Sequence, residues 1–380
     1  MSGVQSVQLI PGPARDTEPP DAVLRIVRGN DGKALHYILS SPLGRLGYRN
    51  KPVGVVPVPT LKDPVLLLSG LFQELDHLAR QPVDGLTEEE RRAGVRTIQS
   101  LGNNLYADLF PDELKEEYWR LVALRNAGKI NSLLVLSDEP WIPWEMVLPY
   151  EDDQPEEDFL CMGWRFSRWC ASRGLAPQLQ VQAAQLVAPA LDLEYVQAER
   201  RYFEELARRN LTVRPPITRR GAFLELMETG GVQLCHIASH GRFDAADVDR
   251  SPIIMEDDEL LPTDLAPVHT RGLRQERPLI FLNACHAGRV DFTLTGIGGW
   301  AQRVVDHLAA TAFIGAYWEV HDELAAGFAA AFYDELGQGA LLGDALRAAR
   351  RVTRARQPAN PTWLAYTLYG HPNAQVKVGR

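Results

Sequence analysis

The sequence predicts an α/β protein in which a mostly parallel sheet is flanked by helices. Two observations support this fold class. From residue 181 onward, strand-like segments alternate with helix-like segments of about ten residues or more, which is typical of parallel strands covered by helices on both faces. The chain has 380 residues, of which 45% are hydrophobic and 23% are charged, so it is long enough for two or even three buried cores.

The residue pattern in the first part of the chain predicts a smaller α/β region. Residues 22–58 form short alternating runs punctuated by Gly and Pro, a pattern that predicts strands joined by turns. Helical spacing follows at residues 68–80, and Thr87 is a suitable N-cap for a second helix. Residues 132–136 predict a buried strand, and residues 151–158 predict an acidic loop that contains proline.

The second part of the chain predicts the main sheet. Its strands are expected at residues 181–188, 212–214, 232–238, 279–284 and 311–317, and its helices at residues 194–209, 220–229, 299–308 and 323–336. We therefore expect a flexible leader (1–21), an N-terminal α/β companion region (22–175) and a main α/β domain (176–380).

Charge and cysteine content argue against several classes of protein. The 40 Lys and Arg residues are outnumbered by 49 Asp and Glu residues, and the net charge of −9 disfavours a nucleic-acid surface. No segment has the roughly 20 apolar residues of a membrane-spanning helix, and the N-terminus does not resemble a secretory signal. The four cysteines form no CxxC pair, which argues against a disulfide framework or a cysteine zinc site. We expect a soluble, cytoplasmic protein without nucleic-acid or membrane partners.

Two predicted strands end in residues that carry chemistry. The strand at 232–238 leads into His240 and Gly241, and the strand at 279–284 leads into Cys285. In an open α/β sheet, ligands bind beyond the carboxyl ends of the strands, so neighbouring strands would bring a thiol nucleophile beside a base. The backbone N–H groups of Gly241 and Cys285 suit an oxyanion site. A cysteine at a strand end is by itself more often a small buried hydrophobe, and the pairing with His240 favours catalysis.

Several segments together resemble a known family. They are CHIASHGRFD (235–244), LIFLNACHAG (279–288), AFIGAYWEVHDELAAGFAAAFYDEL (312–336), GDALRAARR (343–351), WIPWEM (141–146) and LGNNLYADLFPDEL (101–114). In this combination and order they resemble a CHAT domain, a caspase-like cysteine peptidase family of clan CD that is related to separase. The resemblance covers roughly residues 95–375.

The resemblance implies a fold and a set of site residues. It implies a caspase-like sheet, preceded by a companion region similar to the inactive, pseudo-caspase-like half of separase-like proteins. It makes Cys285 the nucleophile and His240 the general acid and base of an endopeptidase. It also places Asp322 in the pocket for the side chain before the cut, which implies a basic residue there. Because Asp is a favoured helix N-cap, a capping role for Asp322 is the alternative.

The resemblance also implies a biological setting. It implies a specific protein substrate, an activating partner protein, and a role in bacterial immunity, including antiviral defence, or in programmed cell death. The Cys–His chemistry requires no cofactor. The competing function is a catalytically silent caspase-like scaffold that binds a partner protein.

Two other patterns suggest ligand sites that we do not favour. Residues 296–301 match GxGxxA, but no convincing strand leads directly into them, so a nucleotide-binding regulator is the remoter alternative. His236 and His240 lie about 13 Å apart if both are on one strand, which is too far for a shared metal ion. We therefore expect no metal site.

Two clusters of side chains are interpreted as structural. Four arginines on the C-terminal helix predict a solvated face, and four tryptophans around the acidic loop predict packing between the two regions. The arginines are Arg347, Arg350, Arg351 and Arg354, and the tryptophans are Trp141, Trp144, Trp164 and Trp169.

Overall fold

A computed structural model describes residues 18–57, 64–139, 142–169, 174–189, 194–208, 211–241, 250–285 and 297–379. The strands are β1 (Ala22–Arg28), β2 (Ala34–Ser40), β3 (Lys51–Pro57), β4 (Ser132–Ser137), β5 (Arg165–Trp169), β6 (Gln178–Val181), β7 (Ala183–Val187), β8 (Thr212–Ile217), β9 (Leu234–His240), β10 (Ile253–Ile254), β11 (Glu259–Leu260), β12 (Leu279–Cys285), β13 (Ala312–Ala316), β14 (Tyr366–Gly370) and β15 (Gln375–Val378). The helices are α1 (Pro64–Ala79), α2 (Glu88–Leu109), α3 (Asp112–Asn126), α4 (Leu160–Gly163), α5 (Glu194–Arg208), α6 (Arg220–Thr229), α7 (Arg271–Glu276), α8 (Ile297–Asp306), α9 (Asp322–Gly337), α10 (Leu342–Arg356) and α11 (Thr362–Ala365).

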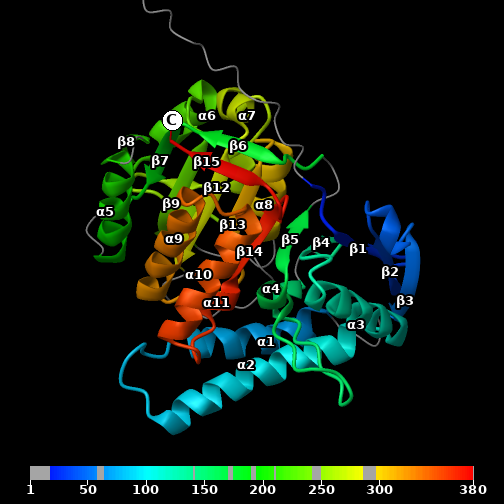
Figure 1. Cartoon of the computed structure of the whole chain (residues 1–380). Coiled ribbons are helices and arrows are strands. Elements are labelled where there is room, and N and C mark those ends of the chain that lie inside the picture. The colour runs from blue at the N-terminus through cyan, green and yellow to red at the C-terminus, as the bar shows by residue number, and fades with distance from the viewer. Residues whose placement is uncertain are drawn as a thin grey trace, which may run out of the picture.

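Eleven strands form one continuous central sheet in the order β3-β2-β1-β4-β5-β14-β13-β12-β9-β7-β8. The pairs β13–β12, β12–β9, β9–β7 and β7–β8 are parallel, and antiparallel pairs occur at β1–β2, β2–β3 and β13–β14. Helices α5, α9 and α10 lie side by side against the main sheet (Figure 1). The predicted fold class, a mostly parallel sheet flanked by helices, is confirmed.

The two expected regions of the chain share this sheet through β5 and β14, which pair at Arg168 and Tyr369. Next to this pair, the buried guanidinium of Arg168 lies 4.0 Å from the buried carboxylate of Glu145, and Thr367 donates a hydrogen bond to the same carboxylate. Burial of a charge requires a partner of opposite sign, and the N-terminal region supplies both charges while Thr367 comes from the main domain.

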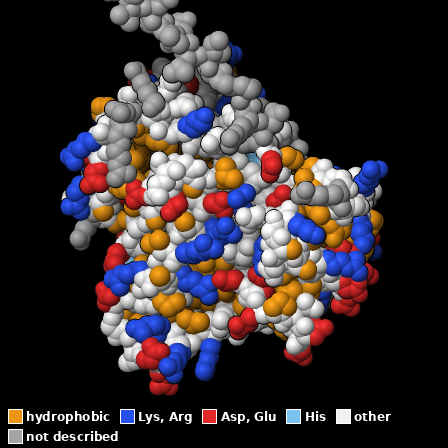
Figure 2. All heavy atoms as spheres, in the orientation of Figure 1, with side chains coloured by type: hydrophobic (Ala, Val, Ile, Leu, Met, Phe, Trp, Pro, Cys, Tyr) orange, Lys and Arg blue, Asp and Glu red, His pale blue; other side chains and the backbone are white. Residues whose placement is uncertain are grey.

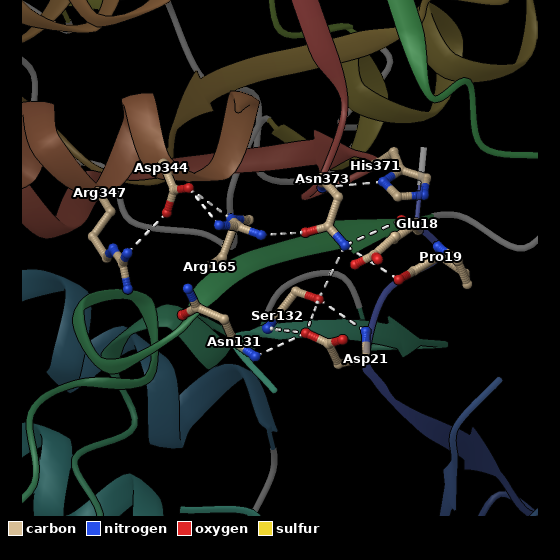
Figure 3. Close-up of polar contacts among 10 residues, drawn as sticks. All are labelled: Glu18, Pro19, Asp21, Asn131, Ser132, Arg165, Asp344, Arg347, His371 and Asn373. Atoms are coloured by element: carbon tan, nitrogen blue, oxygen red, sulfur yellow. Dashed lines mark hydrogen bonds and ion pairs between the residues drawn. The ribbon is translucent and has the colours of Figure 1, made fainter. Parts of the chain in front are cut away.

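A second polar cluster connects the N-terminal ends of β1, β4 and β5 with the turn after β14 (Figure 3). Arg165 pairs with Asp344 at 2.6 Å and donates to Asn373 at 2.9 Å. Asn373 in turn donates to the backbone oxygens of residues 18 and 19, and the Asp21 carboxylate accepts from the N–H groups of residues 131 and 132. Residues 18–21 of the expected leader therefore contact the folded protein, and residues 1–17 lie outside the described part.

One predicted strand is wrong in its extent. The segment 181–188 forms two strands in different sheets, because β6 ends at Val181 and pairs with β15, whereas β7 begins at Ala183 and pairs with β8 and β9. The Gln233 side-chain oxygen accepts hydrogen bonds from the N–H groups of Gln182 and Ala183, which holds the chain at this break. The segment, VQAAQLVA, contains neither Gly nor Pro, so no turn signal marks the change of sheet.

The prediction that the four arginines of α10 form a solvated face is also wrong at one position. Arg350 is buried and donates to the backbone oxygens of Cys161 and Tyr366. Arg347 pairs with Asp344, and Arg354 pairs with Asp158 of the acidic loop. The three described tryptophans are buried: Trp144, Trp164 and Trp169. The rings of Trp144 and Trp164 contact Tyr37 and Tyr118 of the N-terminal region, so packing between the two regions stays a prediction. Trp141 lies outside the described residues.

Acidic and basic side chains are interspersed over the face shown in Figure 2. None of the helices in the described segments combines the length and apolar character that crossing a bilayer requires.

Candidate active site

The two residues predicted to react occupy the ends of adjacent strands. β9 ends at His240, β12 ends at Cys285, and the parallel register between these strands pairs His240 with Cys285 directly. Neighbouring strands lie about 4.7–4.9 Å apart, so the two backbones lie side by side at the carboxyl edge of the sheet. The side chains of both residues lie outside the described part, as do residues 242–249 and 286–296, which include His286 and Gly296.

The chain beyond His240 is attached to the short strand β10. Gly241 forms an isolated antiparallel bridge with Ile253, and the Ser239 hydroxyl donates to the backbone oxygen of Ile254 at 2.7 Å. These contacts fix the backbone on both sides of His240. Gly241, whose N–H is the predicted oxyanion donor, is therefore held at the sheet edge.

A buried polar network lies next to the two strands, on the side of α5 and α9. One carboxylate oxygen of Glu199, on α5, accepts from the Asn283 side chain and lies 3.3 Å from Nε2 of His236. His236 Nδ1 lies 2.9 Å from the Tyr333 hydroxyl, and the Tyr366 hydroxyl donates to Asn283 at 2.6 Å. Asn283 is two residues before Cys285, and His236 is four before His240. One helix thus bridges both strands that carry the candidate pair.

Sequence reasoning missed this network, although a signal was present. His236 and Asn283 are polar residues within otherwise apolar strands, and buried polar groups require partners. Burial raises the pKa of Tyr333 well above its ordinary value, and the nearby Glu199 charge adds to the effect. The Tyr333 hydroxyl therefore stays protonated and remains a hydrogen-bond donor.

The other described cysteines are unsuited to nucleophilic chemistry. Cys161 and Cys235 are free and fully buried, and burial raises the pKa of each thiol to about 12. A thiol at that pKa carries almost no thiolate at neutral pH. Cys170 lies outside the described residues.

A pocket of about 620 Å³ lies between α5 and α9, with His236 of β9 among its lining residues. Asp322, Glu199 and Tyr202 also line it. Helices α5 and α9 follow β7 and β13, and β9 and β12 lie between those two strands in the sheet. The pocket is therefore located over the strands that end in His240 and Cys285.

Asp322 is the first residue of α9, and the N-cap position belongs to His321. The alternative in which Asp322 caps the helix is therefore wrong. Helix α1 holds the loop before it, because Asp76 accepts a hydrogen bond from the N–H of Glu319 at 3.0 Å and Arg80 pairs with the Glu319 carboxylate at 2.6 Å. Burial raises the pKa of Asp76 to about 6.

The remaining ligand patterns have no support in the described segments. Within them, no group of three or more His, Cys, Asp or Glu side chains is arranged to hold a metal ion. In the GxGxxA pattern, Gly298 and Gly299 lie inside α8, and residues 286–296 before this helix lie outside the described part, so none of the described strands leads directly into it. A glycine-rich phosphate loop requires a strand immediately before its turn.

Comparison with known proteins gives a consistent result. The sequence model of the CHAT domain matches residues 99–371. Two structures of the separase–securin complex of Saccharomyces cerevisiae are similar, with TM-scores of 0.53 and 0.52, 12% identity, and 94% of this chain covered. The chain spans only 30% of the matched separase chain.

A structure of the Arg-specific cysteine proteinase gingipain R is also similar, with a TM-score of 0.46 and 11% identity over 79% of this chain and 80% of that one. No protein with a curated description matches the sequence. The similarity to separase shows a shared caspase-like fold, and the family match spans well over half of the sequence. The chain belongs to the CHAT domain family.

Proposed function

We propose that this protein is a cysteine endopeptidase that cleaves a specific protein substrate, with Cys285 as nucleophile and His240 as general acid and base. The observation that carries the proposal is the register of β9 and β12, which pairs the two residues at the carboxyl edge of the sheet. A thiol and an imidazole on adjacent strand ends are the minimum that acyl transfer by cysteine requires.

The reaction follows from these groups. The Cys285 thiolate attacks the scissile carbonyl carbon, and the backbone N–H groups of Gly241 and Cys285 stabilise the resulting oxyanion. His240 donates a proton to the leaving amine as the C–N bond breaks, which leaves a thioester on Cys285. Water then attacks the thioester, His240 accepts its proton, and the carboxylic acid product is released with the thiol restored.

The pocket between α5 and α9 supports a preference for a basic residue before the cut. Asp322 lines this pocket at the start of α9, and a carboxylate is the natural partner of a lysine or arginine side chain. The N-cap position of α9 is occupied by His321, so Asp322 is not the cap residue of this helix.

Regulation by a partner protein is also part of the proposal. The similar separase structures are complexes with securin, so the same fold accommodates a bound partner in that protein. A role as a regulated effector in bacterial immunity or programmed cell death rests on membership of the CHAT family.

The test is intact-protein mass spectrometry with a peptidyl acyloxymethyl ketone that carries arginine at its first position. We expect the wild type to gain the mass of one probe and Cys285→Ala to gain none. Cys161→Ala is the matched control and keeps the gain, because Cys161 is a buried thiol on α4. Labelling that survives in Cys285→Ala would contradict the assignment. No labelling with probes carrying arginine, lysine or apolar residues would favour a scaffold.

A further inference from the structure

We infer that Glu199 is the residue that selects an arginine side chain in the pocket between α5 and α9. The inference deepens the proposed function and rests on it in one respect, namely that the arginine belongs to the substrate residue before the cut. That the pocket binds a guanidinium group can be tested without any cleavage.

The pocket is placed where a substrate side chain would enter. Its walls run along both helices, from Tyr195 to Phe203 of α5 and from Asp322 to Tyr333 of α9. Both helices begin beyond the carboxyl ends of parallel strands, so the end of the pocket at Tyr195 and Asp322 lies at the edge where β9 and β12 end. The pocket and the candidate catalytic pair therefore share one edge of the sheet.

Glu199 lies at the depth that a long side chain would reach. It contacts Asn283, which precedes Cys285 by two residues, or about 6.6 Å along a strand. An arginine whose carbonyl group is at Cys285 would extend its stem over a comparable length, with its charged group near Glu199. Asp322, which is partly exposed, would face the same stem nearer the surface.

The pocket also contains buried polar atoms without partners. One carboxylate oxygen of Glu199, a residue only 4% exposed, has no hydrogen-bond partner among the described residues, and the same holds for Nδ1 of His321. Leaving such groups unpaired in a buried site costs free energy, which a ligand that donates hydrogen bonds would recover. The other oxygen of Glu199 is engaged by Asn283, so the free oxygen is available to a ligand.

The walls and charges favour arginine. Alanines at 198, 326, 329 and 330 and the stacked rings of Tyr202 and Tyr333, 6.1 Å apart, provide an apolar channel for a methylene stem. Glu323, which also lines the pocket, is already paired with Arg356. The exposed Arg201 lines the pocket too, and its positive charge opposes the binding of a guanidinium. A guanidinium has five donors in a planar fork, so it can pair with the free Glu199 oxygen and a second acceptor, whereas an ammonium acts as a point charge.

The test measures binding to the Cys285→Ala protein by isothermal titration calorimetry. The probes are the Nα-acetyl methylamides of arginine, lysine and citrulline, the last being an uncharged analogue of arginine. We expect arginine to bind about tenfold or more tightly than citrulline, because a buried charge-assisted hydrogen bond is lost with the charge. Glu199→Gln should reduce this preference to below about threefold while citrulline binding is kept.

Glu204→Gln is the matched control. Glu204 is also on α5, but it is exposed and pairs with Arg200, so its loss should leave the preference unchanged. Should Glu199→Gln unfold, Ala326→Leu provides a second variant, since it fills the pocket without touching the polar network. It should weaken binding of all three probes.

The outcomes separate this inference from the proposed function. Equal binding of arginine and citrulline, or a preference that persists in Glu199→Gln, overturns the role of Glu199 even where Cys285 is labelled by other probes. Conversely, a preference that depends on Glu199 supports the pocket even where Cys285 proves unreactive, and the peptidase proposal then fails alone.

Discussion

At the scale of single residues, the sequence predicts two candidate reactive positions, but not the register that pairs them. The sequence points to His240 and Cys285 because each follows an apolar strand segment and is flanked by small residues. That they stand directly opposite each other depends on the register of β9 and β12, which are separated in the chain by β10, β11 and α7. Register between strands so far apart is set by packing of the whole sheet, so a local pattern could not reveal it.

Residue-scale chemistry also predicts a pH dependence of stability. His371 Nδ1 accepts a hydrogen bond from the N–H of Asn373, and burial lowers the pKa of His371 to about 4. In the unfolded chain its pKa is about 6.5, so between these values the unfolded state binds the extra proton and stability falls as pH falls. Relative to His371→Gln, the wild type should lose about 2 kcal/mol of unfolding free energy between pH 7 and pH 5, measured by urea denaturation.

Asp76 changes stability in the opposite direction as the pH falls, and it provides the control. Because the folded protein raises its pKa to about 6, the folded state binds the proton first, and this residue adds stability as pH falls from 7 to 5. The Asp76→Asn variant should therefore lose more unfolding free energy than the wild type between pH 7 and pH 5. Parallel pH curves for the wild type and His371→Gln would show that His371 is not the titrating group.

At the scale of elements, the sequence placed most helices and strands but not the partners against which they pack. The capping box at Thr87 and Glu90 starts α2 as the sequence predicts. Helix α1 is also where helical spacing predicts it, yet its contact with the loop before Asp322 links segments far apart in the chain. Strands β5, β14 and β15 were missed, because short segments of four or five residues carry too little periodic signal.

Two glycines in helices predict opposite effects of the same substitution. A Cβ atom at Gly102 in α2 would lie 2.6 Å from the backbone oxygen of Met146, whereas a Cβ at Gly327 in α9 would meet nothing within 4 Å. Gly102→Ala should destabilise the protein by about 1–3 kcal/mol because α2 must move away from the chain at Met146. Gly327→Ala should stabilise it by up to about 1 kcal/mol, since alanine is the better helix former.

Both effects are measured by thermal unfolding of the two variants beside the wild type. A Gly102→Ala protein as stable as Gly327→Ala would mean that α2 does not pack closely against residues 146–148.

At the scale of the whole molecule, the sequence predicted two α/β regions, and the structure unites their strands in one sheet. The sequence could not reveal this, because β14 comes from the end of the chain and lies between β5 and β13. The buried pair of Arg168 and Glu145 adjoins the same junction. The division at residues 175 and 176 remains a prediction about how the chain is organised.

The shared sheet predicts that the two regions unfold together. In hydrogen-exchange mass spectrometry at increasing urea concentration, peptides from β4 and from β12 should lose protection at the same midpoint. Separation of strands at the β5–β14 junction would expose buried polar groups on both sides, which favours a single cooperative transition. Loss of protection in β4 well before β12 would instead indicate two domains that are stable independently.

The position of α5 and α9 places the pocket lining on different elements from the candidate reactive residues. The strands β9 and β12 carry the candidate reactive residues, whereas most of the pocket lining belongs to helices that follow the flanking strands β7 and β13. Exchanges among the small residues of these helix faces would alter which side chain is admitted while leaving the strand register intact. Under the proposed function, substitutions confined to these two helix surfaces would change the accepted side chain and leave the paired strand ends unchanged.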